Sequence, residues 1–133
     1  MKNGENLPGY KKKSFVLPYN GGEIWFEHLD GIYGHEELVL NKLAGDSHIF
    51  SRPSAPAYVC FVFNETRVTG NIINAVKNSI LESGKHFMKI AFVGLDRMSV
   101  RKFRKELAGK GFDINFPEGL EDAKEWLLMN QNS

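Results

Sequence analysis

The run AYVCFVF, Ala57–Phe63, carries no charge and is followed by NETRVTG (64–70) and NIINAVKNSILES (71–83). Apolar and polar residues do not alternate in the first run, which is typical of a strand buried on both faces of a parallel sheet. The third run has the apolar spacing of an amphipathic helix, through Ile72, Ile73, Val76, Ile80 and Leu81. A buried strand, a loop and a helix in this order predict an α/β fold.

Upstream, the sequence predicts a β-hairpin. SFVLPY (14–19) and EIWFEH (23–28) flank Asn20-Gly21-Gly22, residue types that accept the positive φ of tight hairpin turns. Pro18 lacks a backbone N–H, which places the first hairpin strand at a sheet edge. A helix is expected next, over Gly34–Ala44, with Leu40, Leu43 and Ala44 buried. Residues 45–56 are then expected to form a loop that could start with a short helical turn.

Downstream, strand and helix patterns continue to alternate. Gly84 is expected to end the helix that begins near residue 71. FMKIAFVGL, Phe87–Leu95, is a second mostly apolar strand, and Ser99 is the expected N-cap of the following helix. That helix is expected to bury Val100, Phe103 and Leu107. FDINF (112–116) predicts a short strand and LEDAKEWLLM (120–129) a last helix, with Leu120, Ala123 and Leu127 inward.

The predicted order is therefore β-β-α-β-α-β-α-β-α. It defines an α/β fold with a single mixed, mostly parallel sheet of about five strands, covered by about four helices. We expect a flexible N-terminal leader over residues 1–13, one domain over 14–129 and a C-terminal tail over 130–133.

Composition excludes several classes of protein. The chain has 133 residues, 42% hydrophobic and 25% charged, which suits one globular domain. Lys+Arg 17 against Asp+Glu 16 gives no bulk charge to attract nucleic acid, so a nucleic-acid partner is not expected. No apolar run reaches the roughly 18 residues of a membrane span. A single cysteine, Cys60, cannot form an internal disulfide and favours a cytoplasmic location.

The sequence shows no catalytic or metal-binding motif. Cys60 lies within a buried strand, where desolvation makes a thiol a poor nucleophile. The histidines are scattered, without the i, i+4 spacing of a helical zinc site: His28, His35, His48 and His86. We therefore expect no metal or other cofactor, and binding or regulation is favoured over catalysis.

The element order, the segment AYVCFVF-NETRVTG-NIINAV and the ending FDINFPEGLEDAKEWL resemble the STAS domain, the fold of anti-sigma factor antagonists, and in particular its divergent SpoIIAA-like branch. The resemblance covers roughly residues 14–129. In STAS regulators the loop before the second helix carries an Asp-Ser-Ser-Gly sequence whose first serine is phosphorylated. Alignment on Gly70 puts Thr69 at the second serine, Val68 at the phosphoacceptor and Arg67 at the aspartate. The resemblance thus implies a regulatory module without the usual phosphoacceptor serine.

The 64–70 loop is nevertheless the first candidate site. Thr69 can cap the following helix, Thr66 or Thr69 could accept a phosphate, and Arg67 beside free helix N–H groups could hold an anion. The residues expected to form a binding or regulatory loop are Asn64, Thr66, Arg67, Thr69 and Gly70.

Two further surfaces are candidates. The helix around 97–107 is rich in bases, and its face with Arg101, Arg104 and Lys105 would suit an acidic partner. Phe26, Tyr33 and Phe92 are candidates for an apolar pocket, because SpoIIAA-like proteins are similar to SEC14-type lipid binders.

The leading hypothesis is a non-catalytic regulatory module that binds another protein. The alternatives are a protein that binds a small apolar, lipid-like ligand, and an enzyme acting on a phosphorylated or acyl substrate near Arg67.

Overall fold

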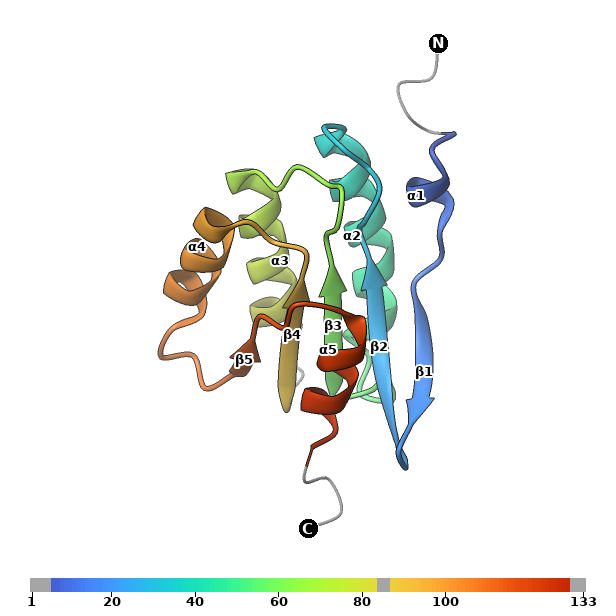
Figure 1. Ribbon diagram of the computed structural model, residues 1–133, viewed down its shortest axis with the longest axis vertical. Coiled ribbons are helices and arrows are strands. Elements are labelled where there is room, and N and C mark those ends of the chain that lie inside the picture. The colour runs from blue at the N-terminus through green and yellow to red at the C-terminus, as the bar shows by residue number, and fades with distance from the viewer. Residues whose placement is uncertain (1–5, 84–86, 130–133) are drawn as a thin grey trace.

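The structure, a computed structural model, describes residues 6–83 and 87–129. Its five-stranded sheet follows the order of the chain (Figure 1). The strands are β1 (Phe15–Tyr19), β2 (Gly22–His28), β3 (Tyr58–Val62), β4 (Lys89–Val93) and β5 (Asp113–Asn115). β1 pairs antiparallel with β2, and every later pair is parallel. The predicted mixed, mostly parallel α/β sheet is confirmed.

The described helices are α1 (Pro8–Lys11), α2 (Glu36–Phe50), α3 (Gly70–Glu82), α4 (Arg97–Leu107) and α5 (Leu120–Leu127). Right-handed crossovers that always step to the next strand put α2, α3 and α4 on one face of the sheet. Their apolar side chains share one core, whereas α5 packs with a second core on the opposite face. Figure 1 shows α5 crossing in front of the strands, with α2 and α3 behind them.

The central strands carry most of the fold. β3 and β4 are parallel neighbours in the register Tyr58↔Lys89 to Val62↔Val93, and both are almost wholly buried. This is the arrangement that their apolar runs predict. The hairpin is also confirmed, because Asn20 and Gly21 have φ values of 47° and 85°, and β1 with Pro18 lies at the sheet edge.

Several expected details are wrong. α2 does not end at Ala44 but runs to Phe50, whose ring lies between Trp25, Phe61 and Phe87 in the core. Burial of this large ring outweighs the cost of about 1 kcal/mol for Gly45 inside the helix. Ala44 is exposed and Leu40 only half-buried, so Leu43 alone of that predicted stripe is buried.

Helix ends and faces account for the other differences. Asp96, not Ser99, caps α4: its Oδ1 accepts a hydrogen bond from Ser99 N at 2.7 Å. Leu81 and Leu120 were expected to be buried and are exposed. The predicted helix end at Gly84 falls outside the described residues.

The second half of the expected leader is packed against the domain. Pro8–Lys11 form α1, and Tyr10 packs against the core under α2. Gly9 is buried so tightly that a Cβ there would lie 2.4 Å from the carbonyl oxygens of Asp30 and Gly31. Residues 8–11 are therefore helical and in close contact with the loop after β2.

Candidate functional site

The loops that leave β2 and β3 are joined to each other beyond the strand ends. Gly31 N donates to Asn64 O at 2.8 Å, Tyr33 N to Glu65 O at 2.9 Å, and Arg67 N to Tyr33 O at 2.8 Å. Residues 31–34 and 64–70 together are called the paired-loop edge below. It lies where β2 and β3 end, the side on which open α/β sheets usually bind their ligands (Figure 1).

Thr66 holds this edge together. Its hydroxyl donates to Leu29 O at 2.6 Å and accepts from Ile32 N at 3.1 Å. Both bonds satisfy backbone groups of the neighbouring loop, so the Thr66 side chain has a structural role.

Thr69 is the N-cap of α3, as expected. Its Oγ1 accepts from Ile72 N at 3.2 Å and donates to the carboxylate of Glu36, in the first turn of α2. Asn71 Nδ2 lies 3.5 Å from both oxygens of the same carboxylate. A carboxylate of the chain itself thus lies at the N-terminus of α3, where a negative charge is favoured.

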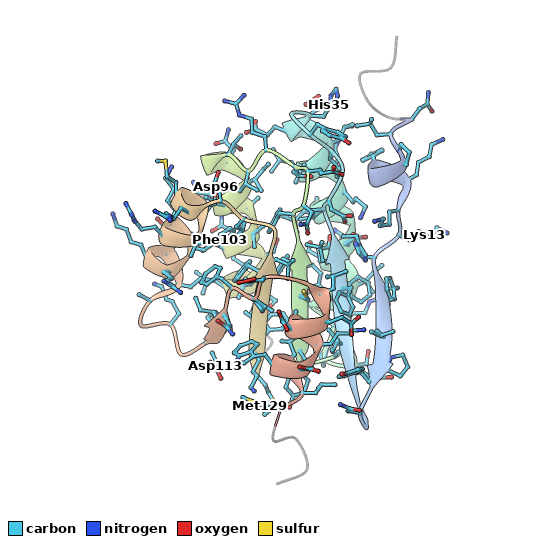
Figure 2. All side chains as sticks on the ribbon, in the orientation of Figure 1. Lys13, His35, Asp96, Phe103, Asp113 and Met129 are labelled. Carbon is cyan, nitrogen blue, oxygen red and sulfur yellow. The ribbon has the colours of Figure 1, made fainter. Side chains whose placement is uncertain are left out.

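Other residues of the edge are exposed to solvent. Arg67 and Gly70 are exposed, and Tyr33 is 53% exposed. Tyr33 and Glu65 both adopt the left-handed backbone conformation, with φ of 53° and 56°. This conformation is strained for a side chain such as tyrosine. Figure 2 shows His35 and Asp96 at this same end of the molecule.

Asn64 fills the space at the end of β4. A Cβ on Gly94, which has φ of 85°, would lie 2.5 Å from Asn64 N and 2.8 Å from its side chain. The close approach of the two chains requires glycine at position 94 and fixes the start of the 64–70 loop.

The structure does not bring together the three residues expected to form an apolar pocket. Phe26 belongs to the core on the α5 face, where Phe15 and His28 stack against it. Phe92 lies on the opposite face of the sheet, and Tyr33 lies on the paired-loop edge.

Phe92 does border a cleft of about 390 Å³ between β4, the start of α4 and the segment after β5. Its lining includes Leu95, Val100, Phe116 and Glu118. Phe92 itself is 1% exposed, so the cleft offers little of this ring to an apolar ligand.

The basic side chains of α4 lie on its solvent side, as the helical pattern predicts. Arg101, Arg104 and Lys105 are all exposed, while Phe103 and Leu107 are buried. Arg104 lies over the ring of Phe116, with its Cζ 5.0 Å from the ring centroid.

A buried polar cluster between β2 and α2 was not foreseen. Glu27 is fully buried, and its Oε1 accepts from Trp25 Nε1 at 2.9 Å. Among the described residues its Oε2 has no hydrogen-bond partner. Burial, reinforced by the neighbouring carboxylate of Asp46, raises the pKa of Glu27 to about 9. Burial also lowers the pKa of Lys42, in the same cluster.

Ser14 and Lys42 connect this cluster to the edge strand. Ser14 Oγ donates to Asp46 Oδ2 at 2.8 Å and accepts from His28 N at 2.9 Å. Lys42 Nζ donates to His28 O and to Ser14 Oγ. The available sequence signals are Glu27, which follows the apolar run Ile24–Phe26, and the i, i+4 pair Lys42 and Asp46.

A second ion network ties α1 to the end of β2. Asp30 lies 2.8 Å from both Lys12 Nζ and His28 Nδ1. Burial opposes ionisation of Asp30, but hydrogen bonds from His28 and Lys12 outweigh it and lower its pKa to about 2.

Cys60 is buried in β3, and burial raises its pKa to about 12. Within residues 6–83 and 87–129, no three His, Cys, Asp or Glu side chains are grouped as a metal site would require. No helix in this part of the chain has both the length and the apolar character needed to cross a membrane.

In comparisons with known proteins, no family model, no curated protein and no solved structure matches the chain.

Proposed function

We propose that the chain is a non-catalytic regulatory module of the STAS, SpoIIAA-like type that binds another protein through the paired-loop edge. The β-β-α-β-α-β-α-β-α succession and the mostly parallel sheet support this proposal. A cytoplasmic location and a protein partner, rather than a nucleic acid, belong to the same proposal.

The observation that carries the proposal is the conformation of Tyr33. Backbone bonds to Glu65 and Arg67 hold it in the left-handed region, yet its ring is exposed. Burial of the ring therefore does not offset the backbone strain, which points to a role in binding rather than in stabilising the fold. The exposed Arg67 lies beside Tyr33, since its backbone N–H donates to Tyr33 O. Tyrosine and arginine dominate the binding energy of many protein interfaces.

The hydroxyl groups of the loop support binding without phosphorylation. Thr66 and Thr69 are both engaged in bonds that hold the fold. Val68, at the position of the family's phosphoacceptor, packs against the core. The exposed side chains that this edge leaves for a partner are those of Tyr33, Asn64, Glu65 and Arg67.

Affinity capture with the native chain from its source cells, followed by calorimetry on the purified partner, tests the proposal. We expect Tyr33→Gly and Arg67→Ala each to weaken binding at least about tenfold, as loss of an interface anchor does. Tyr33→Gly should leave the unfolding free energy unchanged or slightly higher, because glycine relieves the strain.

Arg52→Ala, at another exposed arginine, is the matched control and should bind normally. If the captured partner binds Tyr33→Gly and Arg67→Ala as tightly as the native chain, the paired-loop edge is not the binding surface.

A further inference from the structure

The surface of α4 is strongly basic. From Asp96 to Lys110 the chain has two acids and six bases: Arg97, Arg101, Lys102, Arg104, Lys105 and Lys110. All six basic side chains are exposed. Asp96 caps the helix and Glu106 lies 3.0 Å from Lys77 Nζ of α3. Asp96 also attracts Lys102, and Glu106 attracts Lys105 and Lys110, but two acids against six bases leave this surface with a net positive charge.

The surface of α5 has the opposite charge. Glu121, Asp122 and Glu125 are exposed, and Lys124 is the only basic residue in the sequence of α5. Lys124 is half-buried, paired with Glu121 at 2.7 Å and close to the ring of Tyr19. Asp122 and Glu125 have no ion pair among the described residues.

These two charged surfaces belong to different faces of the sheet. Phe103 and Leu107 anchor α4 in one core, while Ala123 and Leu127 anchor α5 in the other. Glu118, before α5, borders the same cleft as Val100 of α4, but among the described residues no acid of α5 forms an ion pair with a base of α4. The formal charge of only +1 leaves little overall repulsion between copies to oppose such a contact.

We propose that the basic surface of α4 docks onto the acidic surface of α5 in a second copy of this chain. This inference goes beyond the proposed function, since it uses neither Tyr33 nor Arg67. Exposed apolar side chains beside each surface, Met98 at 66% and Leu120 at 39%, add contact area. Because the two surfaces differ, the association is head-to-tail: one copy of a pair keeps a free acidic surface and the other a free basic surface.

Sedimentation velocity of the purified chain tests the proposal. We expect concentration-dependent association at about 20 mM salt and monomers at about 500 mM, where screening acts within a few ångströms. Arg101→Gln/Lys105→Gln and Asp122→Asn/Glu125→Gln should each be monomeric at low salt. These substitutions spare the contacts of Arg104 with Phe116 and of Lys124 with Glu121.

Mixing the two variants gives the decisive result. One variant keeps its acidic surface and the other its basic surface, so the mixture should form dimers and nothing larger. Lys11→Gln/Lys13→Gln removes the same charge elsewhere and should associate like the native chain.

A native chain that is monomeric at low salt would overturn the proposal. The basic surface of α4 would then be expected to bind an acidic partner other than a second copy of this chain. Variants that stay monomeric when mixed would overturn it too. Each variant keeps the charged surface that the other has lost, so a contact between α4 and α5 should form again in the mixture. Matching thermal unfolding curves would show that neither variant has lost its fold.

Discussion

Glu27 shows how one buried side chain can make stability depend on pH. Its carboxyl group is fully buried beside Trp25, and its pKa is raised to about 9 from 4.5. Between these values the folded chain holds a proton that the unfolded chain releases. Stability is therefore greatest below pH 4.5 for this group and falls as the pH rises towards 9.

We expect Glu27→Gln to remove most of this dependence. The amide can still accept from Trp25 and has no proton to lose, so the variant should be more stable than the native chain at pH 8. Each pH unit between 5 and 8 contributes up to about 1.4 kcal/mol for one proton. Urea unfolding at several pH values measures the slope for both proteins.

Glu23→Gln is the control, because Glu23 is exposed on the same strand. It should leave the slope unchanged. A Glu27→Gln variant that is less stable at pH 8, with the native slope, would show that Glu27 is ionised and paired with Lys42.

At the scale of single elements, the start of α3 joins three parts of the chain. Thr69 caps the helix and also bonds to Glu36 of α2. We expect Thr69→Ala to lower the unfolding free energy by about 0.5–2 kcal/mol, the usual cost of a lost cap. Partner binding should persist, since the Thr69 side chain faces α2 and α3. Chemical unfolding and calorimetry measure the two effects.

Thr69→Ser keeps the hydroxyl and should retain most of the stability. If Thr69→Ala abolishes partner binding while the fold is intact, Thr69 is a binding residue and its phosphorylation becomes the question to test.

Elements with a strong local pattern could be predicted from the sequence. β3 and β4 are mostly apolar, and α3 has a clear apolar face, so the order, type and direction of these elements follow from their patterns. The end of α2 could not be predicted, because Phe50 continues the helix only through contacts with distant rings. The N-cap of α4 was predicted at the wrong residue because Asp96 and Ser99 are both good capping residues.

The candidate site could be predicted in location but not in detail. The loop after β3 is where the sequence placed it, and Thr69 caps its helix. The pairing of that loop with residues 31–34 depends on backbone bonds between segments that are distant in sequence. The sequence alone therefore predicts a pocket position for Tyr33, which is exposed on the edge. Glu36 and the Glu27 cluster were missed because their partners are likewise distant in sequence.

At the scale of the whole molecule, the sheet divides the hydrophobic interior into two cores. Phe92 and Phe103 stack in the core under α2, α3 and α4, with ring centroids 4.5 Å apart. Ile24 belongs to the smaller core under α5. Because dense packing transmits strain mainly through direct contacts, substitutions on opposite faces should act independently.

Double-mutant cycles should distinguish coupling within one core from coupling across the sheet. Phe92→Leu and Phe103→Leu should be non-additive by about 0.5–1.5 kcal/mol, because either change alone already removes the ring contact. Ile24→Val with Phe103→Leu should add within about 0.5 kcal/mol. Urea unfolding of the single and double variants gives both coupling energies. A coupling across the sheet as large as that within the ring pair would show that the two cores respond as one, and that β3 and β4 do not separate them energetically.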